Sequence, residues 1–108
     1  MKWRVEQKSP SLIAVTIDGK LGGKEAVELM DEVIGKMTSA TDVLFDLKKM
    51  KWIDSSGLGV LVQILQKANA AGRRVVLAEL REEPKIVFDI TKVNRVFEIV
   101  PHVSDAKL

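Results

Sequence analysis

The side chains with the clearest chemical potential lie in residues 54–59, which read Asp-Ser-Ser-Gly-Leu-Gly. This stretch follows the apolar pair Trp52-Ile53 and precedes a segment whose apolar residues recur with helical spacing, so both serines are placed at the start of a helix. A serine there could cap the helix by accepting a backbone N–H, with the aspartate favourably placed for the helix dipole. Alternatively, one of the hydroxyls could react.

Nucleotide-binding loops and serine hydrolase sites do not fit this stretch. A Walker loop ends in Gly-Lys-Ser/Thr, and neither residues 57–59 nor residues 22–25 supply that ending. A dinucleotide loop needs a small residue where Val62 stands. A nucleophile elbow needs a glycine where Ile53 stands, and the only histidine, His102, is far along the chain. We therefore expect neither an enzyme nor a bound cofactor.

Composition excludes further classes of site. The 108 residues hold 17 Lys and Arg against 15 Asp and Glu, and this net charge of +2 favours neither nucleic acid nor a membrane surface as partner. The absence of cysteine removes disulfides and thiolate metal sites, and the carboxylates show no metal-binding spacing. Lys48, Lys49 and Lys51 beside Trp52 are predicted to lie in a surface loop, as a solubilising group or a small anion-binding patch. The N-terminus lacks the apolar stretch of a signal peptide, so we expect a cytoplasmic protein.

A regulatory reaction remains for an exposed serine. The neighbouring glycines keep side-chain bulk low, so the backbone of another protein can come close. A phosphate would add about −1.5 to −2 charges and a tetrahedral group at the centre of that surface. The N-terminus of a helix tolerates such an anion, so the fold should survive. The stretch therefore predicts a protein-interaction surface that phosphorylation switches.

The elements that must position this stretch alternate between strands and helices. The predicted strands are residues 2–6, 12–17, 43–45, 75–78 and 97–100; the predicted helices are residues 26–37, 55–71 and a third from residue 82, with a terminal turn within residues 103–108. In the third helix, Ile86, Val87 and Ile90 are predicted to face the sheet. This order predicts an α/β fold in which a mixed sheet of about five strands is flanked by three to four helices.

Over its whole length the sequence resembles the STAS domains, and among them the stand-alone bacterial anti-sigma factor antagonists. The resemblance rests on residues 17–21 (Ile-Asp-Gly-Lys-Leu), 43–47 (Val-Leu-Phe-Asp-Leu) and 52–61, with similar patterns at residues 72–77 and 96–99. It implies a single STAS domain over residues 1–108. It also implies binding to an anti-sigma factor that is a serine kinase, which frees a sigma factor, and a phosphatase that reverses the phosphorylation. ATP would belong to the kinase.

The resemblance also implies roles for individual residues. The family's phosphoacceptor is the hydroxyl residue directly after the motif's aspartate, which is Ser55 here, with Ser56 as the second choice. The partner-binding positions that it implies are Asp54, Ser56, Gly57, Leu58, Gly59, Leu21 and Gly22. One position departs from the pattern, because Gly22 stands where the family often has an aspartate that helps partner binding or phosphorylation.

That departure keeps a second interpretation open. In it, the chain is a STAS subunit whose partner is not a sigma regulator, such as a stressosome-like assembly or the soluble component of a lipid transporter. A third interpretation is a small ligand at the N-terminus of the second helix, by analogy with nucleotide-binding members of the family. For the anti-sigma factor antagonist we expect a monomer or a weak dimer.

Overall fold

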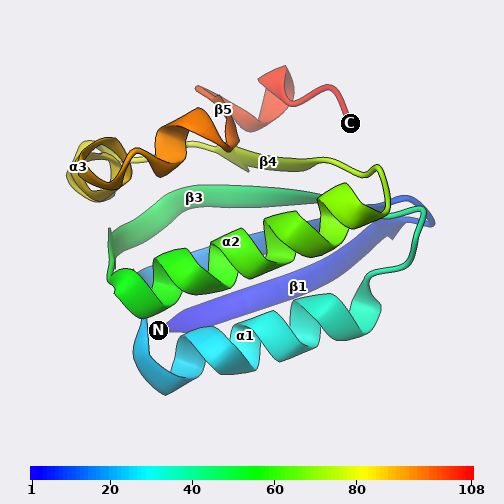
Figure 1. Ribbon diagram of the computed structural model, residues 1–108, viewed down its shortest axis with the longest axis horizontal. Coiled ribbons are helices and arrows are strands. Elements are labelled where there is room, and N and C mark those ends of the chain that lie inside the picture. The colour runs from blue at the N-terminus through cyan, green and yellow to red at the C-terminus, as the bar shows by residue number, and fades with distance from the viewer.

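The computed structural model describes residues 1–108 and shows a five-stranded sheet with three α-helices and two short 3₁₀ turns (Figure 1). The elements are β1 (Lys2–Ser9), β2 (Leu12–Leu21), α1 (Gly23–Lys36), β3 (Asp42–Ile53), α2 (Ser55–Ala70), β4 (Val75–Ala78), α3 (Glu82–Thr91), η1 (Val93–Arg95), β5 (Glu98–Val100) and η2 (Val103–Asp105). The strands lie side by side in chain order, with β1 antiparallel to β2 and every other neighbouring pair parallel. The predicted mixed-sheet α/β fold is therefore confirmed.

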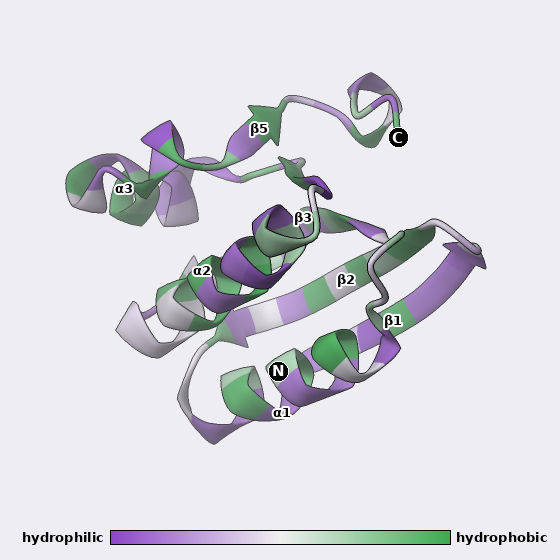
Figure 2. Ribbon diagram, turned by 45° about the vertical axis from the view of Figure 1, so that its right-hand side comes forward, coloured by the Kyte–Doolittle hydropathy of each residue, from purple (hydrophilic) through white to green (hydrophobic).

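This strand order determines where the helices lie. Parallel strands are joined by right-handed crossovers, and crossovers that all advance in one direction place their helices on one face of the sheet. Accordingly, α1 and α2 lie side by side in front of the sheet, and α3 packs against β3 at the left end of the sheet (Figure 1). The main core fills the space between: β2 contributes Ile13, Val15 and Ile17 at alternate positions, while α1 contributes Leu29 and Val33 at helical spacing (Figure 2).

The opposite face of the sheet is largely uncovered. The C-terminal segment covers only one part of it, where Leu44, Val76, Ala78 and Ala106 form a small second core. The rest carries charged side chains of β1, β2 and β3, among which lies a hollow of about 420 Å³. None of the helices combines the length and apolar composition needed to cross a bilayer.

Strand β3 is longer than the sequence suggests. Residues 48–51 belong to this strand, so the prediction of a surface loop for Lys48, Lys49 and Lys51 is wrong. Parallel pairing with β2 continues as far as Leu21 opposite Ile53, and the backbone of β2 therefore holds these polar residues in extended form. Register shifts after Thr16 and Gly19 interrupt the alternation of buried residues, which is why the strand pattern is hard to see in the sequence.

Helix α3 buries a face that matches the prediction only at Val87, which packs against the main core. Ile86 and Ile90 are 52% and 73% exposed, whereas Pro84 and Phe88 are buried, so the prediction that Ile86 and Ile90 face the sheet is wrong. Both pairs have the spacing of one helical turn, and periodicity alone cannot choose between them. The ring of Phe88 packs edge-on against Phe97, with the ring centres 6.3 Å apart, and this larger buried area decides the orientation.

Candidate functional site

The first turn of α2 follows directly from the end of β3. Asp54 is the N-cap: its backbone is extended and its Oδ1 accepts a hydrogen bond from the N–H of Gly57 at 2.9 Å. The N–H of Asp54 also donates to the carbonyl of Leu21, the last residue of β2. Asp54 thus fixes both the start of the helix and its position against the neighbouring strand.

Two glycines allow this turn to approach the loop between β2 and α1. A Cβ on Gly57 would collide with the carbonyl oxygen of Leu21 and would lie 2.8 Å from Cγ1 of Ile53. A Cβ on Gly22 would collide with the carboxylate of Asp54. The backbone of Gly22 is extended, a conformation that any residue adopts, so its missing side chain is what matters here.

The space beside Gly22 is therefore filled by a carboxylate from the other side of the turn. Oδ2 of Asp54 lies 3.7 Å from Nζ of Lys20, and the lysine is largely exposed. Such an exposed pair adds little stability, because solvent screens it. Position 22, where the resemblance implies an aspartate, has no room for a side chain as long as Asp54 keeps this position.

Both serines remain free for chemistry. Ser55 and Ser56 are exposed at the first turn of α2, and since Asp54 provides the cap, neither hydroxyl takes part in a side-chain hydrogen bond. The interpretation of a serine as the cap is therefore wrong. The four amides at the start of a helix carry partial positive charge, and here only that of Gly57 is bound by a side chain.

The other predicted positions divide into exposed and buried ones. Gly22 and Gly59 lie near the surface, and no atom lies within 4 Å of a Cβ built on Gly59. Leu21 is fully buried and Leu58 is 8% exposed, so these two support the surface from below rather than forming it. A glycine inside a helix costs about 1 kcal/mol relative to alanine. Packing therefore does not explain why position 59 is a glycine, and a role at the surface is the alternative explanation.

The remaining reactive groups lie elsewhere. His102 lies in the segment that follows β5, where its Nδ1 is 3.7 Å from Oε2 of Glu79. The imidazole is therefore not beside Ser55. A hydrogen bond from the N–H of Val103 lowers the pKa of Glu79. The nearby His102 lowers this pKa further, by a smaller amount. Lys48 and Lys49 line the 420 Å³ hollow on the open face with Asp18 and Asp46. None of these groups adds a base to the serine turn.

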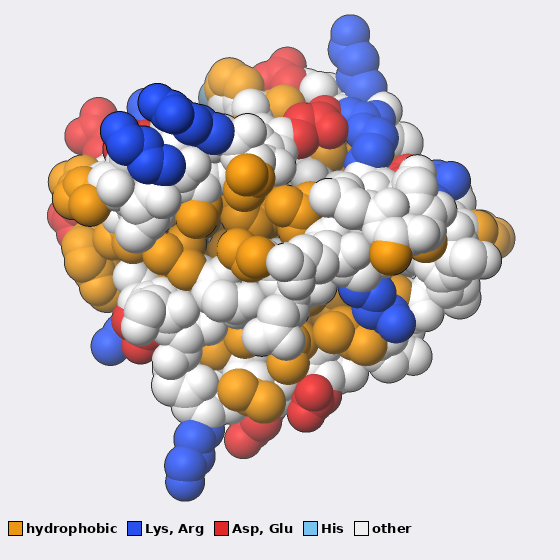
Figure 3. Space-filling model, viewed as in Figure 1, with side chains coloured by type: hydrophobic (Ala, Val, Ile, Leu, Met, Phe, Trp, Pro, Cys, Tyr) orange, Lys and Arg blue, Asp and Glu red, His pale blue; other side chains and the backbone are white.

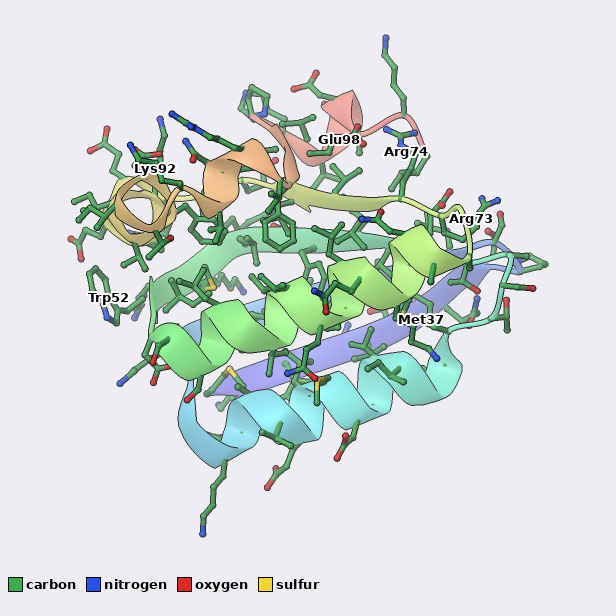
Figure 4. All side chains as sticks on the ribbon, in the orientation of Figure 1. Met37, Trp52, Arg73, Arg74, Lys92 and Glu98 are labelled. Atoms are coloured by element: carbon green, nitrogen blue, oxygen red, sulfur yellow. The ribbon has the colours of Figure 1, made fainter.

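Sequence reasoning missed two features near the turn. Lys20 was not singled out, although its position two residues before Gly22 places it beside the motif. Trp52 was considered as part of the motif and of a basic cluster but not as a contact residue, yet its ring is 41% exposed at the end of β3 and points outward (Figure 4). A large aromatic two residues before the cap was the available signal.

Comparison with known proteins identifies the family of this chain. The STAS domain family matches residues 3–106. The anti-sigma-B factor antagonist of Bacillus subtilis is 29% identical over 87 residues, which are 81% of this chain and 80% of that protein. The Thermotoga neapolitana homologue of the anti-sigma factor antagonist TM1081 is 31% identical over 78 residues, 72% of this chain and 67% of that protein.

Solved structures show the same fold. The anti-sigma factor antagonist SpoIIAA in its unphosphorylated form superposes with a TM-score of 0.81 at 14% identity, covering 92% of this chain and 88% of SpoIIAA. The phosphorylated form of Bacillus SpoIIAA superposes with a TM-score of 0.70 at 18% identity, covering 92% and 91%. The match over residues 3–106, together with the shared fold, shows that this chain belongs to the STAS domain family.

Proposed function

We propose that this chain is an anti-sigma factor antagonist that binds an anti-sigma factor with kinase activity and dissociates when that kinase phosphorylates Ser55. Two relatives described as anti-sigma factor antagonists, or as homologues of one, support the class. The observation that carries the proposal is the capping of α2 by Asp54, which leaves the hydroxyl of Ser55 exposed and unpaired at the positive end of a helix.

The reaction belongs to the kinase. The Oγ of Ser55 attacks the γ-phosphorus of ATP; the bond from that phosphorus to the β-phosphate oxygen breaks, ADP leaves, and the serine proton passes to a base of the kinase. This chain supplies only the nucleophile and its presentation. Since no atom lies within 4 Å of a Cβ built on Gly23 or Gly59, the surface around the turn is open and a kinase active site can reach the hydroxyl.

Phosphorylation would then end binding through charge and volume. The product carries about −1.5 to −2 charges, next to the carboxylate of Asp54. The free N–H groups of the first turn of α2 can donate hydrogen bonds to the phosphate, so the fold is kept. A partner packed closely on the turn has to bury that charge or withdraw from it, and an unpaired buried charge costs about 2–5 kcal/mol or more.

The test uses the purified chain, an anti-sigma kinase from the same genome and ATP, with phosphosite mapping by mass spectrometry. We expect one phosphate at Ser55, and loss of binding of about 30-fold or more for Ser55→Asp by isothermal titration calorimetry. Ser55→Ala should bind like the wild type and accept no phosphate. Ser56→Ala is the matched control and should still be phosphorylated.

Three outcomes would contradict the proposal. Phosphate found at Ser56 alone would move the acceptor by one residue. Failure of the wild-type chain to bind any anti-sigma factor of its genome would overturn the function. A large homogeneous assembly on size-exclusion chromatography, without such binding, would instead favour a scaffold with a different partner.

A further inference from the structure

The turn that carries Ser55 is poor in apolar surface. Its accessible residues are small: Ser55, Ser56 and Gly23 are exposed, and Gly59 is half-buried. The neighbouring Ile53 is fully buried. Stable protein interfaces bury about 800 Å² on each partner and draw most of their affinity from a few large side chains, with Trp, Tyr and Arg enriched among them. A partner docked only on this turn would lack such an anchor.

Large exposed apolar side chains are concentrated close by. Six occur in the chain, and four of them lie at the end of β3, on α3 or directly after η1: Trp52, Ile86, Ile90 and Val96. Trp52 is three residues before Ser55 and projects from the end of β3 below α3 (Figure 4). We call Trp52, Ile86 and Ile90 the α3 surface. Figure 3 shows apolar side chains gathered at this end of the molecule, over α3 and beside the start of α2.

The isoleucines are exposed because of the way α3 is packed. Pro84 and Phe88 fix the opposite side of α3 in the core. Residues two positions from a buried residue point about 200° away from it around a helix, so Ile86 and Ile90 are directed outward one turn apart. No segment of this chain covers them. Side chains of this size at the surface are typical of interaction sites.

The charges around the α3 surface are mainly positive. The nearby cations are Lys51 beside Trp52, Lys85 and Lys92 on α3 and its C-cap, Arg95 on η1, and Arg81 at the N-cap position of α3; none of the five forms an ion pair within the chain. The acidic residues of α3 are Glu82, Glu83 and Asp89. Five cations against three carboxylates favour a partner with an acidic rim.

From this combination, which rests on the proposed function, we infer that the α3 surface is a second contact area for the anti-sigma factor. It receives an apolar patch of that protein that is bordered by Asp and Glu. Trp52 and Ile90 act as anchors, and the turn at Ser55 lies beside them as the switch. A second copy of this chain fits poorly, because a two-fold interface would place one basic rim against another.

The experiment measures the affinity of the anti-sigma kinase for Ile90→Glu and Trp52→Ala by isothermal titration calorimetry. Leu108→Glu is the matched control, because it places the same charge on an exposed apolar residue at the C-terminus, on the opposite side of the molecule from α3 (Figure 1). We expect each α3-surface variant to bind about 30-fold more weakly and the control to bind like the wild type. Circular dichroism of Ile90→Glu should match the wild type, since the residue is 73% exposed.

The outcomes separate this inference from the proposed function. Wild-type affinity in both α3-surface variants, together with loss in Ser55→Asp, overturns the inference and leaves the function intact. Loss in the α3-surface variants while Ser55→Asp binds normally supports the surface and overturns the switch. An absence of any anti-sigma binding by the wild type overturns both.

Two further measurements test other occupants of the same surface. A dimer on light scattering that Ile90→Glu abolishes would assign the surface to a second copy. Binding to phosphatidylglycerol vesicles that Ile90→Glu abolishes, without an effect on the anti-sigma factor, would assign it to lipid. Either result overturns the inference.

Discussion

The first turn of α2 and the outer face of α3 are exposed at the same end of the molecule, but they differ in side-chain size and in charge. The turn presents hydroxyls, glycines and one carboxylate, whereas α3 and the end of β3 present Trp52, Ile86 and Ile90 among basic residues. Small residues let a reactive group be reached, and large ones supply buried area. Under the proposed function, separating the two would let one phosphate change the interaction without requiring the anchoring surface to change.

The sharpest test of this comparison is kinetic. A contact remote from the reacting hydroxyl contributes equally to ground-state and transition-state binding, so its loss raises KM and leaves kcat unchanged. We expect Ile90→Glu to raise the KM of the anti-sigma kinase for this chain about 30-fold at constant kcat. Steady-state phosphorylation measures both constants. A fall in kcat with an unchanged KM would show that α3 positions Ser55 and does not anchor the kinase.

A smaller effect is expected where the turn is packed against the β2–α1 loop. Gly57→Ala places a methyl group against the carbonyl of Leu21, and we expect a loss of about 1–3 kcal/mol in the free energy of unfolding. Urea denaturation measures this loss. Gly35→Ala is the control, because no atom lies within 4 Å of a Cβ there. Equal stability of Gly57→Ala and the wild type would mean that the turn is not held against the loop.

The cap distinguishes Asp54 from the serine beside it. Removing the capping side chain in Asp54→Ala should cost about 1 kcal/mol of stability, within a usual range of about 0.5–2 kcal/mol. Ser55→Ala removes an exposed hydroxyl without a hydrogen bond and should change stability by less than about 0.5 kcal/mol. Thermal denaturation of the two variants gives the order. The reverse order would identify Ser55 as the cap and weaken its assignment as a free acceptor.

The smallest expected effect has the opposite sign. Gly59→Ala replaces a helical glycine in open space and should stabilise the chain by up to about 1 kcal/mol. The added methyl group should nonetheless weaken binding of the anti-sigma factor, because it stands on the surface that the partner approaches. Urea denaturation and calorimetry on the same variant measure both quantities. Unchanged affinity would remove Gly59 from the contact area.

Sequence pattern predicted most elements because apolar spacing reports directly on burial. The order of strands and helices, the mixed sheet and the placement of residues 54–59 at the start of a helix are confirmed. The pattern was misleading where two sets of residues have the same spacing. Residues 84 and 88 and residues 86 and 90 both define a helical stripe, and only the contact of Phe88 with Phe97 distinguishes them. Likewise, the polar run in β3 is extended because β2 pairs with it.

The sequence by itself determined that the chain folds as an α/β sheet and that it carries an exposed serine motif of the STAS type, since local spacing and residue type are enough for both. Tertiary structure alone decided which group caps α2, why position 22 is a glycine and which side of α3 is exposed. Each of these depends on which of two groups occupies one space in the folded chain: the carboxylate of Asp54 or a Cβ at Gly22, and Phe88 or Ile90 in the core.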